Sequence, residues 1–195
     1  NDFSMHFYYD APNAQKMYQR IPWRLQQFKR AIEVARDVRK GETPNVWITE
    51  HARGIDFGGI KARDARPFTS NLAAAVSTAD FLIALAQIPE VQGASWHGLN
   101  ALPWQLFDPE NNLQPNPVYW ALRVLKASEA PQVLATYTRS SNLSSYQGGY
   151  DTRAVVLSDP DSSNISVWVV NRATTHMQVE LNLADWAGKQ VGIKH

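Results

Sequence analysis

Residues 22–50 read PWRLQQFKRAIEVARDVRKGETPNVWITE, and this stretch decides the fold. In its first part, apolar side chains recur at three- and four-residue spacing, as at Leu25, Phe28 and Ile32. That spacing is typical of a helix with one apolar stripe. The residues that follow are rich in β-branched and aromatic types, which favour extended structure. A helix over roughly 22–40 and a strand over 45–50 are therefore predicted.

The same alternation of strand and helix extends on both sides of this stretch. Upstream, the aromatic residues 3–9 are predicted to form a strand. Downstream, the pattern predicts a loop over 51–68, a helix over about 70–87, a strand over 91–97, a loop over 98–115 and a helix from Asn116 to about 128. Three strand–helix units in succession imply parallel strands with helical crossovers.

The pattern changes near residue 130. Short apolar segments separated by turn residues predict strands over 133–138, 153–157, 165–171, 177–183 and 191–193. Such spacing is typical of an antiparallel β-sandwich. We therefore expect an α/β unit over residues 1–129 and an all-β sandwich over residues 130–195.

The composition excludes several classes of function. Lys and Arg total 19 and Asp and Glu total 18, so the net charge of +1 gives no reason to expect nucleic acid or an anionic membrane as a partner. The absence of Cys excludes disulfides and thiolate chemistry. No apolar run is long enough to span a bilayer. We expect a soluble protein, and the sequence leaves open whether it is cytoplasmic or secreted.

Polar side chains stand at the predicted C-terminal ends of the three parallel strands, where the reactive groups of such folds lie. They are His6 with Tyr8, Glu50 with His51, and Trp96 with His97. Strict alternation places His6 and Tyr8 on one face of their strand, and it places Glu50 on the face of Val46 and Ile48. Each also has a structural interpretation: a hydrogen-bonded histidine, a glutamate paired with Arg53, or a core tryptophan.

Other chemistries have weaker support. His6, His51 and His97 together could hold a zinc ion, but the chain has neither a His-x-His nor a His-Glu-x-x-His spacing. It also lacks the Gly-x-Ser-x-Gly motif and a glycine-rich phosphate loop. We therefore predict no metal and no cofactor.

The segments Asp2–Tyr9 and Val46–Glu50, with a helix between them, resemble the second half of a clan A glycoside hydrolase barrel. They are similar in particular to the α-L-arabinofuranosidases of glycoside hydrolase family 51. The resemblance implies about three C-terminal strand–helix units of a (β/α)8 TIM barrel, followed by a β-sandwich. It also implies a plant-type polysaccharide substrate that carries terminal α-L-arabinofuranosyl residues.

The same resemblance assigns roles to individual residues. Glu50 would be the nucleophile of a retaining glycosidase. His6 and Tyr8 would line the sugar subsite, with the Tyr8 hydroxyl bonded to Glu50, and Trp96 and His97 would flank the same pocket.

A retaining glycosidase also needs an acid/base carboxylate about 5–5.5 Å from its nucleophile. In clan A this residue is a Glu that follows an Asn, and no Asn-Glu pair occurs in the chain. We therefore expect the acid/base to lie upstream of Asn1 and the chain alone to be inactive. The expected partner is the missing N-terminal part of the barrel, or a second copy of the chain in a homo-oligomer.

Two further hypotheses remain open from the sequence. The first is a non-catalytic carbohydrate-binding sandwich that stacks sugars on Trp168 or Trp186. The second is a metal-dependent hydrolase built on the three histidines His6, His51 and His97.

Overall fold

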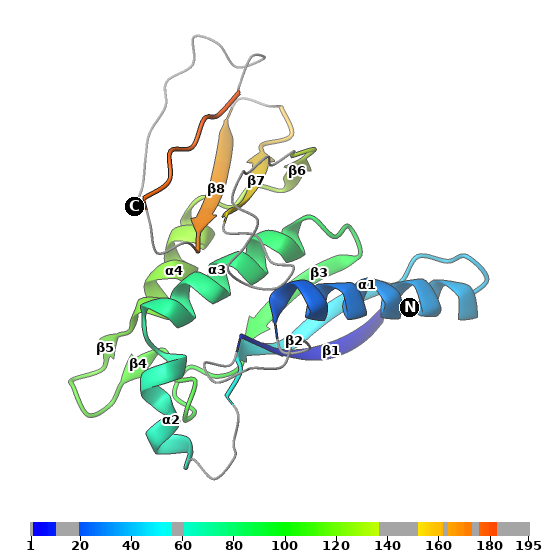
Figure 1. Ribbon diagram of the computed structural model, residues 1–195. Helices are drawn as coiled ribbons and strands as arrows, with labels where there is room; N and C mark the ends of the chain where they lie inside the picture. The colour runs from blue at the N-terminus through cyan, green and yellow to red at the C-terminus, as the bar shows by residue number, and fades with distance from the viewer. Residues whose placement is uncertain are drawn as a thin grey trace.

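The computed structural model describes residues 2–10, 20–55, 61–136, 152–161, 164–172 and 176–182, and these contain two three-stranded sheets (Figure 1). The first sheet consists of β1 (Asp2–Tyr9), β2 (Asn45–Arg53) and β3 (Val91–Trp96). The second consists of β6 (Gln132–Leu134), β7 (Thr152–Ser158) and β8 (Ile165–Asn171). The helices are α1 (Ile21–Val38), α2 (Ala62–Thr69), α3 (Leu72–Ala86) and α4 (Pro117–Ala127), and β4 (Phe107–Asp108) pairs with β5 (Gln114–Pro115).

The first sheet confirms the prediction from the strand–helix pattern. β1, β2 and β3 lie side by side in sequence order and run parallel. One face of this sheet is buried against α1 and α3. There the ring of Phe7 meets Phe28 of α1 edge-on, with ring centroids 5.3 Å apart, and Tyr9 stacks on Phe81 of α3 at 4.3 Å. The opposite face, which we call the open face, carries Trp47 with 44% of its surface exposed.

Residues at the helix ends explain where two of the helices stop or start. The helix predicted over roughly 22–40 ends two residues earlier, at Val38. Lys40 and Gly41 follow with φ 56° and 95°, the Gly41 N–H donates to Arg36 O, and the Lys40 N–H donates to Asp37 O. This pattern is a Schellman motif, which satisfies the last free carbonyls of α1. At the start of α4, the Asn116 side chain accepts from the N–H groups of Val118 and Tyr119, as an N-cap residue does.

All but the last residue of helix α2 lie in the segment that the sequence predicted to be a loop. Pro67 stands within this helix, and no side chain caps its first residue. Proline removes a backbone donor, so it argues against a helix in the sequence pattern. Tertiary packing decides otherwise, because Ala65 and Thr69 are buried, and the Thr69 hydroxyl donates to Pro103 O.

The second sheet is antiparallel, as predicted, with β7 between β6 and β8. The strand predicted over 177–183 is wrong for its described part, because residues 176–182 form no regular secondary structure. Val179 and Leu181 are 46% and 47% exposed. Their alternation is therefore not matched by burial, which is what stabilises a strand. The strand predicted over 191–193 lies outside the described residues.

Helix α3 lies between the two sheets (Figure 1) and is buried on most sides. Phe81 and Leu85 pack on the parallel sheet, whereas Ile83 packs on Val155 and Val170 of the antiparallel sheet. Within the described ranges no single helix is long and apolar enough to cross a membrane, and α2 with α3 meets that test only as a pair bent by 68°.

A cluster of four charged side chains is buried where the two sheets approach α3. We call Asp10, Asp80, Arg153 and Arg172 the buried charge cluster. Arg172 joins both carboxylates, with its Nη2 2.5 Å from Asp10 Oδ2 and its Nη1 bonded to Asp80, while Arg153 Nε also bonds Asp80. Burial by itself would lower the pKa of Arg172, but the two carboxylates together raise it above its ordinary value. Two cations and two anions therefore neutralise one another inside the protein.

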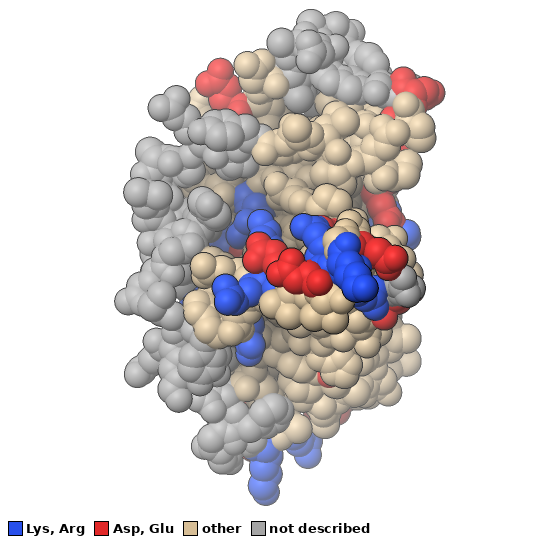
Figure 2. Space-filling view, turned by 90° about the vertical axis from the view of Figure 1, so that its right-hand side faces the viewer, with Lys and Arg blue, Asp and Glu red and all other residues tan. Residues whose placement is uncertain are grey.

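Charged side chains on the surface over α1 are exposed, unlike those of the buried charge cluster. In Figure 2, basic and acidic side chains lie next to one another on this face, and neither sign forms a large continuous area. This mixture agrees with the net charge of +1.

Candidate active site

Glu50 reaches the open face through a β-bulge. Met5 of β1 pairs with Ile48, but the next residue, His6, pairs with Glu50, so Thr49 is an extra residue in β2. The expectation that Glu50 shares a face with Val46 and Ile48 is therefore wrong. An extra residue reverses the alternation and re-aims the side chains beyond it.

Two imidazole nitrogens lie at different distances from the Glu50 carboxylate. His97 Nδ1 lies 2.6 Å from Oε1, and His6 Nδ1 lies 3.7 Å from Oε2. The side chains of Glu50 and His97 are 24% and 22% exposed, and that of His6 is 59% exposed. One carboxylate oxygen thus has an imidazole nitrogen in close contact and the other does not, and the Glu50 side chain is partly exposed.

Tyr8 joins this group in a different way from the one expected. Its hydroxyl lies 2.8 Å from His97 Nδ1, and among the described residues no hydrogen bond joins it to Glu50. Nδ1 of His97 therefore has two oxygen neighbours, the Tyr8 hydroxyl and Glu50 Oε1, and the tautomer of the ring sets whether Nδ1 donates or accepts. We call Glu50, His97, His6 and Tyr8 the open cluster.

Trp104 forms an aromatic wall beside the open cluster. Its ring centroid lies 4.4 Å from that of His97 and 5.0 Å from that of Tyr8. Its indole N–H donates to Arg53 O at 2.8 Å, which ties the loop after β3 to the end of β2. The sequence placed Trp104 in a loop but did not assign it to the site. Its position after the third strand was the available signal, because loops at that edge carry site residues.

Trp96 and His51 lie on the other face of the sheet. Trp96 packs beside Ala74, Ala75 and Val118, and its ring meets that of His51 edge-on at 5.5 Å. The structure therefore does not bring Trp96 to Glu50, although its neighbour His97 is there. Neighbouring residues in extended structure point to opposite faces of a sheet. Trp96 and His97 therefore could not both lie beside Glu50.

The histidines of the metal hypothesis do not converge. His51 is 1% exposed, and its Nδ1 lies 3.2 Å from the Tyr9 hydroxyl behind the sheet. Burial lowers its pKa to about 4, so the ring is neutral at pH 7. In the described ranges no group of three His, Asp or Glu side chains has the geometry of a metal site.

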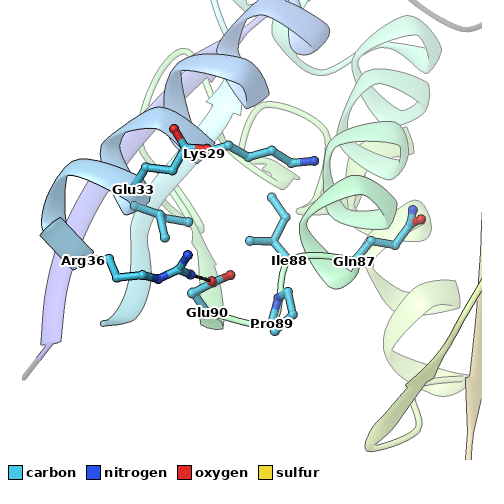
Figure 3. Close-up of a pocket in the computed structure, with 8 residues that line it drawn as sticks. Lys29, Glu33, Arg36, Gln87, Ile88, Pro89 and Glu90 are labelled. Atoms are coloured by element: carbon cyan, nitrogen blue, oxygen red, sulfur yellow. Dashed lines mark hydrogen bonds and ion pairs between the residues drawn. The ribbon is translucent and has the colours of Figure 1, made fainter. Parts of the chain in front are cut away.

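A separate hollow of about 220 Å³ lies between α1 and the turn that leads from α3 into β3 (Figure 3). Arg36 closes one side of it through an ion pair with Glu90 at 2.6 Å, and Lys29 extends from α1 along another. Glu90 directly precedes β3, so this hollow lies at the N-terminal end of the strands. Glu50 lies at their C-terminal end, and the hollow is not part of the candidate site.

Two solved structures have a fold similar to that of this chain. One is a crystal structure of an arabinofuranosidase, which matches with a TM-score of 0.62 and 15% identity over 87% of this chain and 38% of its own. The other is AbfB, a family 51 α-L-arabinofuranosidase from Bifidobacterium longum, with a TM-score of 0.58 and 17% identity over 88% of this chain and 39% of its own. The chain thus spans less than half the length of either structure. No protein-family model and no curated protein matches its sequence.

At such identities the likeness establishes the fold, and it agrees with a parallel strand–helix unit followed by an antiparallel sheet.

Proposed function

We propose that this chain is the C-terminal part of a retaining glycoside hydrolase in which Glu50 is the nucleophile. One observation carries the proposal: a carboxylate with the imidazole of His97 at 2.6 Å and that of His6 at 3.7 Å stands at the C-terminal edge of a parallel sheet. The chain that carries it shares its fold with two arabinofuranosidases. Terminal α-L-arabinofuranosyl residues of polysaccharides are the corresponding substrate.

The geometry suggests which oxygen attacks. Oε1 lies 2.6 Å from His97 Nδ1, whereas Oε2 lies 3.7 Å from His6 Nδ1. Oε2 is therefore the better placed to form a bond to the anomeric carbon as the bond to the leaving oxygen breaks. The leaving oxygen takes a proton from the acid/base carboxylate, and water then releases the sugar from Glu50 with net retention.

We assign the acid/base to a part of the protein upstream of this chain, since the sequence contains no Asn-Glu pair. Within the described residues β1 and β3 each pair only with β2, and such edges can pair with further strands. The remaining barrel strands are the partner that we propose for them. The chain by itself is then inactive.

The binding-module hypothesis receives no comparable support. Trp168 packs against the apolar cluster around Ile83 and Val170, and its indole N–H donates to Ser128 Oγ at 2.9 Å. Its ring is therefore a core contact and not a surface platform. Trp186 lies outside the described residues.

The test is the anomeric configuration of the first sugar released from an aryl α-L-arabinofuranoside by the longer protein that contains this chain. We expect ¹H NMR to show the α anomer first, followed by slow mutarotation. Appearance of the β anomer first would contradict a nucleophilic Glu50. The isolated chain, measured in parallel, should release no sugar above the buffer rate.

A further inference from the structure

Arg53, the last residue of β2, lies three positions beyond Glu50 and has no part in the chemistry proposed above. It pairs with Tyr9 in the last described step of the ladder between β1 and β2. A guanidinium group is planar and carries five N–H donors in a fixed geometry, so one arginine can bond several segments at once. The bonds of Arg53 reach three other segments of the chain at this edge of the sheet.

The guanidinium of Arg53 bonds the residue after β1 and the turn between α2 and α3. Its Nε donates to Asp10 O at 2.9 Å, and its Nη1 donates to Phe68 O at 2.9 Å. Nη1 also donates to Asn71 Oδ1 at 3.3 Å, and the same oxygen accepts from the Ala74 N–H at the start of α3. These three acceptors are uncharged oxygens, so directed N–H groups join the segments and not an opposite charge.

Asp10 gives this guanidinium a rigid anchor. It follows β1 with φ 51°, in the left-handed region that few residues with a side chain adopt. Its carboxylate accepts from the Ser77 hydroxyl at 3.1 Å and from Arg172 of the buried charge cluster at 2.5 Å. Because these bonds fix Asp10, the carbonyl that accepts from Arg53 is fixed as well.

The backbone carbonyl of Arg53 holds the aromatic wall. It accepts the indole N–H of Trp104 at 2.8 Å. The Trp104 carbonyl in turn accepts the indole N–H of Trp96 at 2.7 Å. Bonded on both sides, Trp104 keeps its ring against those of Tyr8 and His97.

One arginine therefore joins the ends of all three parallel strands. Tyr8 stands two residues before the anchor Asp10, and His97 directly follows β3. His97 Nδ1 lies 2.6 Å from Glu50 Oε1, a contact that a displaced loop would not preserve. A misplacement of about 1 Å can lower the rate of an enzymatic reaction about 10²-fold.

We propose that Arg53 is a positioning residue for the reaction, which keeps the loops that carry His97 and Trp104 in place beside Glu50. It does so from outside the chemistry, without contact to the sugar. The effect on turnover rests on the proposed function, whereas the effect on the position of Trp104 does not. The competing role for Arg53 is purely electrostatic, as a positive charge near the Glu50 carboxylate.

Two substitutions separate positioning from charge. Arg53→Lys keeps the charge on a flexible stem but lacks the planar fork of donors, whereas Arg53→Met removes both. Positioning predicts that kcat of the longer protein on an aryl arabinofuranoside falls about tenfold in both variants. A purely electrostatic role predicts a loss in Arg53→Met alone. Since Arg53→Lys is the milder change, the test does not depend on Arg53→Met folding.

The matched control is Arg36→Lys, at the opposite end of the same sheet. Arg36 pairs with Glu90 at 2.6 Å, so its replacement should lower stability without changing kcat. NMR of the isotope-labelled 195-residue chain supplies a readout besides activity. In both Arg53 variants the indole N–H signal of Trp104 should shift. That of Trp168, which bonds Ser128 beside the antiparallel sheet, should stay in place.

A Trp104 signal at its wild-type position in both variants would overturn the positioning role. A wild-type kcat in Arg53→Lys would overturn it too, as would an equal loss of kcat in Arg36→Lys. A shifted Trp104 signal, combined with a longer protein that releases no sugar even as wild type, would instead overturn the proposed function. Arg53 would then remain the residue that holds this edge of the sheet.

Discussion

Glu50 and Asp80 are both carboxylates with nitrogen-bearing side chains beside them, but solvent reaches only one of them. The Glu50 side chain is 24% exposed and that of Asp80 is 2% exposed. Asp80 receives two guanidinium groups, which carry a permanent charge. The nitrogen neighbours of Glu50 are the imidazoles of His97 and His6, which are not permanently charged. The buried charge cluster is thus fully paired, whereas the open cluster retains a carboxylate oxygen that is available for reaction.

The largest expected effect is a loss of turnover when Glu50 of the open cluster is replaced. Glu50→Gln keeps the shape of the side chain but removes the carboxylate that we propose as the nucleophile. In the longer protein, turnover of an aryl arabinofuranoside should fall by a factor on the order of 10⁴ or more. The melting temperature of the variant should stay close to that of the wild type. Residual turnover within tenfold of the wild type would assign the nucleophile to another residue.

The next effect is on stability and belongs to the buried charge cluster. Arg172→Met leaves Asp10 and Asp80 buried with one cation between them, which should cost about 3–5 kcal/mol in the free energy of unfolding. The control is Arg63→Met, whose ion pair with Glu110 is largely exposed and should contribute at most about 1 kcal/mol. Urea unfolding of the three proteins measures both. Equal losses in the two variants would show that burial of the cluster does not determine its contribution.

On the buried face of the parallel sheet, His51 should make the free energy of unfolding depend on pH. The pKa of His51 is about 4 in the folded chain and about 6.5 when unfolded. Between these values the unfolded chain binds more protons, so His51 lowers stability as the pH falls below about 6.5. At pH 5 the loss should be about 2 kcal/mol relative to pH 7.

Comparison with His51→Gln isolates this contribution from those of other titrating groups. Urea unfolding at both pH values should show a smaller acid-induced loss in the variant, by about the same 2 kcal/mol. A variant that loses as much stability as the wild type would mean that His51 is not held neutral in the folded chain.

The smallest effect distinguishes two adjacent tyrosines that point to opposite faces. Tyr8→Phe removes the hydroxyl beside His97 Nδ1 and should lower kcat/KM of the longer protein about tenfold, with little change in stability. Tyr9→Phe removes the buried bond to Thr78 and should cost about 1 kcal/mol of stability without lowering kcat/KM. A loss of kcat/KM in Tyr9→Phe and a loss of stability in Tyr8→Phe would contradict the placement of Tyr8 on the open face and Tyr9 on the buried face.

The sequence predicted those features that depend on local periodicity. The apolar stripe of α1 and the aromatic strand β1 led to the correct order of parallel strands and to the correct edge of the sheet for His6, Glu50 and His97. It failed where tertiary contacts override local pattern. The bulge at Thr49 has no signature in the alternation of β2, and it reversed the predicted face of Glu50.

The buried charge cluster could not be predicted at all. Its bonded pairs are separated by 73 to 162 residues, and charged residues are ordinarily assigned to the surface. Long sequence separation also explains why the expected bond between the Tyr8 hydroxyl and Glu50 was wrong. The position of Tyr8 on the open face was predicted, but only the fold shows that His97, 89 residues away, lies between its hydroxyl and Glu50.

The central claim is that Glu50 is the nucleophile, and covalent trapping tests it most directly. The longer protein is incubated with a 2-deoxy-2-fluoro arabinofuranosyl donor, which slows release of the sugar from the enzyme. It is then digested and analysed by tandem mass spectrometry. We predict one equivalent of sugar on the peptide that contains Glu50, and none in Glu50→Gln. Labelling of another carboxylate, or full inactivation without a covalent adduct, would contradict the assignment.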